Sequence, residues 1–159
     1  MVQIVVMGVS GCGKSTVGQL LAQKLSARFI DGDDLHPESN KAKMAAGNPL
    51  NDDDRWPWLA LVGQALAEGQ TVVACSALKR VYRERILSAA PQTKFVHLSG
   101  SREVLEQRLG ARSGHFMPAS LLDSQLATLE PLAADEPGLV VDIDQPVADI
   151  VAQAVGELG

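Results

Sequence analysis

The stretch Gly8-Val9-Ser10-Gly11-Cys12-Gly13-Lys14-Ser15 matches the pattern G-x-x-x-x-G-K-[ST] in full. In such a loop the glycines let the backbone wrap so that its N–H groups point at phosphate oxygens. Lys14 supplies a positive charge to the β- and γ-phosphates, and the Ser15 hydroxyl is placed to reach Mg²⁺. The sequence therefore predicts a binding site for a nucleoside triphosphate.

The segments on either side of this loop support that prediction. Val2–Met7 is a short run rich in β-branched residues, and Thr16–Ala27 carries apolar residues near helical spacing. A strand before the loop and a helix after it are the context that a phosphate loop requires. A merely tight glycine turn is therefore a poor alternative.

Strand and helix signals alternate to the end of the chain. Further strands are expected at Arg28–Asp31, Thr71–Cys75, Lys94–Leu98 and Leu139–Val141. Helices are expected at Glu38–Ala46, Pro57–Glu68, Lys79–Ala89, Arg102–Arg112, Ala119–Leu129 and Val147–Leu158. Five apolar strands separated by helices predict a three-layer α/β fold, with a parallel sheet because the crossovers are long. We expect a single domain over residues 1–159.

Length, charge and cysteine content narrow the class of protein. The chain has 159 residues and a net charge of −5, which disfavours nucleic acid as a partner. No apolar run approaches the roughly 20 residues of a membrane span, and the start lacks a basic leader. Two cysteines cannot form a disulfide scaffold, so we expect a cytoplasmic protein without membrane contact.

Cys12 has two interpretations. It lies near the start of a predicted helix, where the pKa of a thiol tends to fall, and this allows a redox role. The favoured interpretation is a small residue tolerated in the loop.

Several classes of nucleotide protein compete. A regulatory GTPase needs N-K-x-D, and Asn40-Lys41-Ala42-Lys43 lacks the aspartate. A large motor or AAA-type ATPase needs more chain than this. A small metabolite kinase fits, with its acceptor site built after the strands. Shikimate or a nucleoside monophosphate as the acceptor, and a slowly hydrolysing regulatory module, stay as alternatives.

An acidic segment follows the second predicted strand. Asp31 and Asp33 project to one side if the chain is extended there, while Asp34 projects to the other and suits a helix cap. One carboxylate can serve Mg²⁺ while the other orients and deprotonates an acceptor hydroxyl. We assign the metal to Ser15 and Asp31, with Asp142 as the alternative carboxylate.

Basic residues follow several predicted strands. Arg55 lies at a helix start, where the helix dipole disfavours a cation unless an anionic ligand is near. Lys79 and Arg83 are one helical turn apart and face either the cleft or solvent. Arg108 and Arg112 lead into a polar loop, which predicts a mobile lid over about residues 108–118.

These segments together resemble the gluconate kinase (gluconokinase) family, a small P-loop sugar-acid type related to shikimate kinase. The matching stretches are GVSGCGKS, DGDDLHPESNKAKMAAGNPLNDDDRWPWL, CSALKRVYRERI, RLGARSGHF and LVVDIDQP. The resemblance implies phosphorylation of D-gluconate at its 6-hydroxyl by MgATP. It also implies a nucleoside-monophosphate-kinase-like fold with a five-stranded parallel sheet, a lid and a cytoplasmic homodimer.

The resemblance also assigns roles to particular residues. It implies that Asp33 orients the 6-hydroxyl, and that Arg55, with Lys79 or Arg83, binds the substrate carboxylate or steers the transferring phosphate. His36 and His115 are expected to hydrogen-bond substrate hydroxyls. The expected catalytic residues are Lys14, Asp33, Arg108 and Arg112. The expected ATP ligands are Gly8, Val9, Ser10, Gly11, Cys12, Gly13, Lys14, Ser15, Thr16, Gln145 and Pro146.

Overall fold

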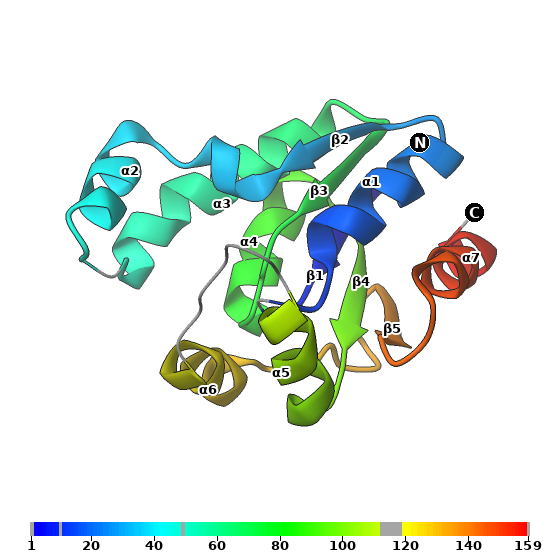
Figure 1. Ribbon diagram of the computed structural model, residues 1–159. Helices are drawn as coiled ribbons and strands as arrows, with labels where there is room; N and C mark the ends of the chain where they lie inside the picture. The colour runs from blue at the N-terminus through cyan, green and yellow to red at the C-terminus, as the bar shows by residue number, and fades with distance from the viewer. Residues whose placement is uncertain (1, 10, 49, 112–118, 159) are drawn as a thin grey trace.

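Five parallel strands form one sheet in the order β2-β3-β1-β4-β5 (Figure 1). The computed structural model describes residues 2–9, 11–48, 50–111 and 119–158. The strands are β1 (Gln3–Met7), β2 (Arg28–Asp31), β3 (Thr71–Ala74), β4 (Lys94–Ser99) and β5 (Gly138–Asp142). The predicted parallel sheet is confirmed.

Helices cover both faces of this sheet. They are α1 (Lys14–Lys24), the 3₁₀ helix η1 (Gly32–Leu35), α2 (Glu38–Ala45), α3 (Asp52–Ala67), α4 (Arg80–Ala89), α5 (Arg102–Ala111), α6 (Ala119–Thr128) and α7 (Val147–Leu158). Helices α1 and α7 pack on one face, and α3 and α4 pack on the other (Figure 1). This is the predicted three-layer arrangement.

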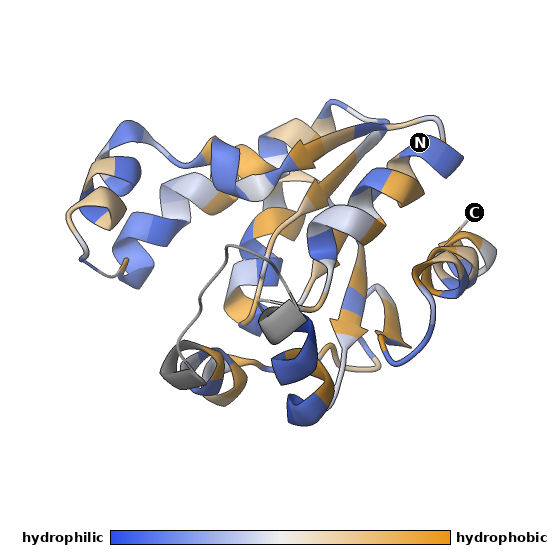
Figure 2. Cartoon of the chain, viewed as in Figure 1, coloured by the Kyte–Doolittle hydropathy of each residue, from blue (hydrophilic) through white to orange (hydrophobic). Residues whose placement is uncertain are grey.

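The core forms because successive side chains of a strand point to opposite faces. In β1, Ile4 and Val6 belong to the apolar cluster under α1 and α7, whereas Val5 and Met7 belong to the cluster under α3 and α4. The central strands are therefore apolar on both faces, as buried parallel strands are, and they appear mostly orange in Figure 2.

The carboxyl ends of β1, β2 and β3 meet at one edge of the sheet. The amide of Gly8 donates to the carbonyl oxygen of Ser76 at 3.2 Å, which links the loop after β1 to the loop after β3. A Cβ at Gly32 would lie 2.6 Å from the carbonyl oxygen of Ala74, so the start of η1 packs directly on β3. The first three loops of the sheet thus form one surface.

Helix α3 begins earlier than the sequence predicts. Its cap is Asn51, whose side chain accepts from the Asp54 amide at 2.9 Å while Asp54 accepts from the Asn51 amide at 2.9 Å. This reciprocal capping box starts the helix at Asp52, and Pro57 lies inside it. The predicted start at Pro57 is wrong, and Arg55 belongs to the first turns of the helix.

No helix in the described ranges is both long and apolar enough to cross a membrane.

Candidate active site

The loop between β1 and α1 has the wrapped conformation that its glycines predict. Gly11 and Gly13 have φ values of 86° and 93°, a region that favours glycine, and Gly13 caps the start of α1. The Nζ atom of Lys14 donates to the carbonyl oxygens of Gly8 at 3.0 Å and Val9 at 3.2 Å. The ammonium group therefore lies across the loop, beside a helix N-terminus that favours anions. Ser15 and Thr16 lie in the first turn of α1, and Ser10 lies outside the described residues.

Cys12 is a packing residue of this loop. Its side chain is fully buried, and burial raises the pKa of its thiol. The expectation of a lowered thiol pKa is therefore wrong, because burial outweighs the nearby positive charge of Lys14. A Cβ at Gly8 would lie 2.7 Å from the Cys12 sulfur, so the two residues fit closely.

The acidic segment after β2 is not extended. Residues Gly32–Leu35 form η1, and Asp31 caps it by accepting from the Asp33 amide at 3.0 Å. The argument from alternating side chains is therefore wrong for this segment. Asp33 keeps an exposed surface, while desolvation and then the charge of Asp31 raise the pKa of its carboxyl group, and Lys14 lowers it. A raised pKa suits a carboxylate that accepts a proton.

His36 is held in one orientation beside η1. Its ring stacks on Trp58 with the centroids 4.2 Å apart, and Asn40 Nδ2 lies 3.2 Å from its Nδ1. Burial lowers the pKa of His36, so the ring is neutral at pH 7. Because the Asn40 amide donates to Nδ1, the ring proton lies on Nε2. Trp58 Nε1 in turn donates to the Gly32 carbonyl oxygen at 2.8 Å.

Four charged or polar side chains from α3 and the start of α4 form what we name the acceptor cluster: Asp52, Arg55, Lys79 and Tyr82. The Tyr82 hydroxyl donates to Asp52 Oδ1 at 2.6 Å and accepts from Arg55 Nη1 at 3.3 Å. Arg55 Cζ and Lys79 Nζ each lie 5.6 Å from the centroid of the Tyr82 ring. Two cations face one carboxylate, so the cluster carries a net positive charge and suits an anionic group.

Electrostatic couplings show which of these residues are close enough to influence one another. The pKa of Asp33 responds to both Lys14 and His36, and that of His36 responds to Asp33 and Arg55. The pKa of Asp52 is lowered by the Tyr82 hydrogen bond and then by Lys79 and Arg55. The structure thus brings the phosphate loop, Asp33, His36 and the acceptor cluster into one site.

Arg83 is a correction to the predicted substrate site. Its guanidinium is fully buried and donates to both carboxylate oxygens of Glu136, at 2.7 and 3.0 Å, and to the Ala77 carbonyl oxygen at 2.8 Å. Both predicted orientations, toward the cleft and toward solvent, are therefore wrong. With His97, which packs beside this pair, these residues form what we name the interior network: Ala77, Arg83, His97 and Glu136.

Arg108 lies near the phosphate loop. Its Nη2 donates to the carbonyl oxygen of Ile143 after β5, and its Nη1 lies 3.8 Å from where a Cβ at Gly13 would be. Arg112 and His115, with the segment 112–118 of the predicted lid, lie outside the described residues.

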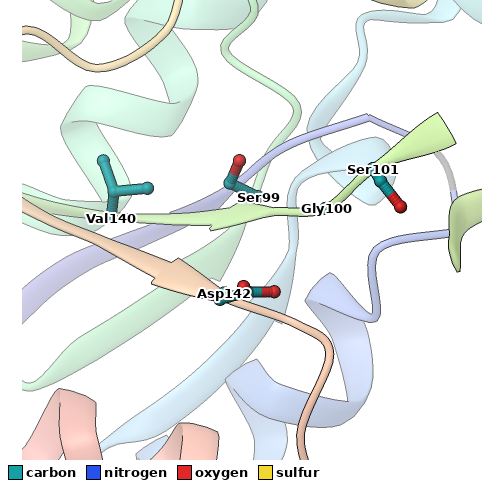
Figure 3. Close-up of a pocket in the computed structure, with 5 residues that line it drawn as sticks. All are labelled: Ser99, Gly100, Ser101, Val140 and Asp142. Atoms are coloured by element: carbon teal, nitrogen blue, oxygen red, sulfur yellow. The ribbon is translucent and has the colours of Figure 1, made fainter.

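The loop after β5 contains Asp142, Gln145 and Pro146. Asp142 Oδ1 accepts from the Asp144 amide at 2.9 Å, and Gln145 Nε2 donates to the Asp142 carbonyl oxygen at 2.6 Å. Figure 3 shows Asp142 beside the end of β4, where it lines an open pocket with Ser99, Gly100, Ser101 and Val140. Asp142 and Asp31 end strands on opposite sides of β1, each two strands away.

The donor set fits Mg²⁺ held mainly by a nucleotide. In the described part of the chain, no three His, Cys, Asp or Glu side chains gather as a metal site. Mg²⁺ is commonly bound by one or two protein oxygens together with substrate phosphates, so Ser15 and Asp31 are sufficient donors.

Tyr82, Asp52 and Asn40 are site residues that the sequence reasoning missed. The available signal is spacing, because Tyr82 lies three residues after Lys79 on the first turn of α4. Nothing in the spacing indicates that the partner of Tyr82 is Asp52, which is thirty residues earlier.

Comparisons with known proteins agree with this arrangement. A family model described as an AAA domain matches residues 4–132. The match covers most of the chain.

Relatives with similar sequences carry kinase names. A probable gluconokinase of Xenopus tropicalis is 48% identical, over 98% of this chain and 92% of that protein. The thermoresistant gluconokinase of Escherichia coli K12 is 49% identical, over 95% of this chain and 90% of that protein.

Solved structures show the same fold. A gluconokinase from Sinorhizobium meliloti 1021 is 52% identical with a TM-score of 0.89, covering 98% of this chain and 90% of that chain. Shikimate kinase from Aquifex aeolicus has a TM-score of 0.62 at 18% identity, covering 98% and 94%, and this likeness shows the fold alone.

Proposed function

The chain belongs to the gluconokinase family, and on this premise we propose that it transfers the γ-phosphoryl group of ATP to the 6-hydroxyl of D-gluconate. The products are 6-phospho-D-gluconate and ADP. The observation that carries the proposal is that the loop of Lys14, the segment of Asp33 and His36, and helix α3 with Arg55 lie against one another at the carboxyl ends of the strands. D-Gluconate has its 6-hydroxyl and its carboxylate at opposite ends, so it fits a site with a phosphate loop at one end and cations at the other.

ATP is held at the phosphate end of the site. The loop amides and Lys14 bind the β- and γ-phosphates, while Gln145 and Pro146 lie near the adenine. Ser15 and Asp31 would hold Mg²⁺, which would supply positive charge to offset that of the phosphates. Asp31 is favoured over Asp142 for this role because it caps η1, which packs on β3 beside the phosphate loop.

Asp33 acts on the acceptor. Its carboxylate orients the 6-hydroxyl and takes its proton as the oxygen attacks the γ-phosphorus and the bond from that phosphorus to the β–γ bridging oxygen breaks. The raised pKa of Asp33 makes it a stronger proton acceptor than an ordinary aspartate. His36 donates a hydrogen bond from Nε2 to a hydroxyl group in the middle of the gluconate molecule.

Cations act at both ends of the acceptor. Arg55 and Lys79 bind the gluconate carboxylate, and Arg83 is left out because Glu136 and Ala77 occupy its donors. Arg108, with Arg112 and His115 after lid closure, stabilises the charge on the transferring phosphoryl group and excludes water. The place of Arg108 beside Gly13 supports this role.

Family membership supports two further parts of the proposal: a homodimer and a cytoplasmic location. Sedimentation of the purified protein and fractionation of cells test them. A monomer, or recovery outside the cytoplasm, would contradict them.

The test is a coupled ADP-release assay with gluconate, shikimate and AMP as acceptors. We expect ADP release to depend on gluconate, and ³¹P and ¹³C NMR to locate the phosphate on carbon 6. Lys14→Ala is the matched control, which should lose most turnover because it removes the charge on the phosphates. Turnover with shikimate or AMP in place of gluconate, or none with any acceptor, would overturn the proposal.

A further inference from the structure

Tyr82 is the residue through which the parts of the acceptor cluster are connected. Its side chain is 5% exposed, and its hydroxyl both donates to Asp52 and accepts from Arg55. Burial and then the hydrogen bond to Asp52 raise the pKa of Tyr82 to about 12, so the hydroxyl keeps its proton at neutral pH. It is therefore a permanent donor to Asp52.

The distances within the cluster show which partner Asp52 engages more closely. Asp52 Oδ1 lies 2.6 Å from the Tyr82 hydroxyl and 3.5 Å from Arg55 Nη1. A carboxylate beside an arginine normally forms a close bidentate pair, which would occupy the guanidinium. Here Tyr82 takes the oxygen that faces Arg55, and the Arg55 side chain is left 33% exposed.

We propose that Tyr82 is a positioning residue that makes the site selective for an acceptor carboxylate, by holding Asp52 so that Arg55 is presented to the acceptor. This inference rests on the proposed function and deepens it. Asp52 is the internal competitor for Arg55, and the Tyr82 hydroxyl limits that competition. Lys79, whose Nζ lies 5.6 Å from the centroid of the Tyr82 ring, adds a second cation.

Tyr82→Phe isolates the hydroxyl, because the ring also packs in the core beneath α3 and α4 and remains in the variant. Without the hydroxyl, Asp52 pairs closely with Arg55. We expect the KM for gluconate to rise about tenfold, the value of one hydrogen bond to a charged group, with kcat and the KM for ATP unchanged.

A neutral acceptor separates selectivity from general damage. Gluconamide has the same 6-hydroxyl and chain but no carboxylate, so its kcat/KM should not change in Tyr82→Phe. The ratio of kcat/KM for gluconate to that for gluconamide should therefore fall about tenfold, because the gluconate KM rises by the same factor. Trp56→Phe is the matched control, because Trp56 touches the edge of the Tyr82 ring without joining its hydrogen bonds.

Asp52→Asn gives a second, independent test with the opposite direction. Removing the competing charge should leave the gluconate KM equal to or lower than that of the unaltered protein. The double variant should behave like Asp52→Asn, which is the non-additivity expected of two residues that act through one contact.

The outcomes are distinct. An unchanged gluconate KM in Tyr82→Phe, an equal loss with gluconamide, or an increase in KM in both single variants would overturn the inference about Tyr82 and leave the proposed function intact. Absence of gluconate turnover by the unaltered protein would overturn both.

Discussion

Arg55 and Arg83 lie on neighbouring helices on the same side of the sheet, yet their surroundings differ completely (Figure 1). Arg83 is 0% exposed and its donors meet Glu136 and a backbone carbonyl. Arg55 is 33% exposed, and its nearest carboxylate is 3.5 Å away and shared with Tyr82. The comparison teaches that the acceptors already present around an arginine, rather than its place in the sequence, separate an internal support from a ligand-binding group.

Substitutions in the two regions should therefore have different effects on the protein. A buried ion pair depends on both members, because removing one leaves an uncompensated charge in the interior. A partly exposed cation with an incomplete set of acceptors is solvated when a neighbour is removed, so the fold tolerates the change. Damage to the interior network should appear as lost stability, and damage to the acceptor cluster as lost function.

The largest expected effect is on the interior network. Glu136→Ala leaves Arg83 buried without its carboxylate, and should lower the free energy of unfolding by about 3–5 kcal/mol. Urea denaturation measures it. Asp135→Ala is the matched control, because Asp135 is the residue before Glu136 and pairs with exposed Arg80, so the unfolding midpoint should hardly move. Equal losses in the two variants would remove the distinction between the two regions.

The next effect sharpens the chemical side of the comparison. Asp33→Asn should lower kcat by about 10²-fold or more, because the site loses its proton acceptor, while the gluconate KM changes little. The pKa of Asp33 is raised. We therefore expect kcat of the unaltered enzyme to decrease as the pH is lowered, beginning at a pH above the usual pKa range of an aspartate. Steady-state rates from pH 4.5 to 8 test both statements. Asp34→Asn is the control, and an equal loss there would contradict the assignment.

A smaller effect belongs to Arg55 itself. Arg55→Ala should raise the gluconate KM about tenfold, because one charge-assisted hydrogen bond to the carboxylate is lost. The unfolding midpoint should stay near that of the unaltered protein. Initial-rate kinetics measure the gluconate KM, and urea denaturation of the same sample measures the unfolding midpoint. A large loss of stability with an unchanged KM would place Arg55 with Arg83 as a structural residue.

The smallest effect is on the pH dependence of stability. Burial and then the charge of Arg83 lower the pKa of His97 in the folded protein, so this histidine binds protons more readily when unfolded. Its contribution is fully present above the unfolded pKa of about 6.5 and is lost as pH falls from there toward the folded pKa.

His97→Gln removes that contribution. Between pH 7 and pH 5 the Tm of the variant should fall about 2–4 °C less than that of the unaltered protein. Thermal denaturation monitored by circular dichroism at both pH values checks it. Parallel decreases in the two proteins would show that His97 carries no share of the acid sensitivity.

The sheet and the phosphate loop were predictable because their signals are local. Five apolar runs and one glycine-rich motif each decide their own structure, and the order of the parallel strands brings their ends together. The sequence also predicts that three site residues lie close together: Asp33, His36 and Arg55. Each belongs to a segment that follows a strand or begins a helix at the carboxyl edge of the sheet.

The error on Arg83 arises because a distant partner decides where its side chain lies. The spacing of Lys79 and Arg83 predicts a shared face, but Glu136, more than fifty residues later, draws Arg83 into the interior. The wrong start of α3 has a local cause instead, because the reciprocal bonds of Asn51 and Asp54 begin the helix before Pro57, which therefore lies inside it. The functional roles of these residues stay predictions, because the comparisons do not test them.

The third hydrogen bond of Arg83 has a consequence for how substrate range changes. It holds the carbonyl of Ala77, a non-glycine residue at φ 45°, two positions before Lys79. The backbone just before Lys79 is therefore held from the interior of the protein by Arg83. If Lys79 binds the acceptor as proposed, substitutions at positions 77, 83 and 136 would move this lysine and so change the range of sugar acids without altering any contact residue.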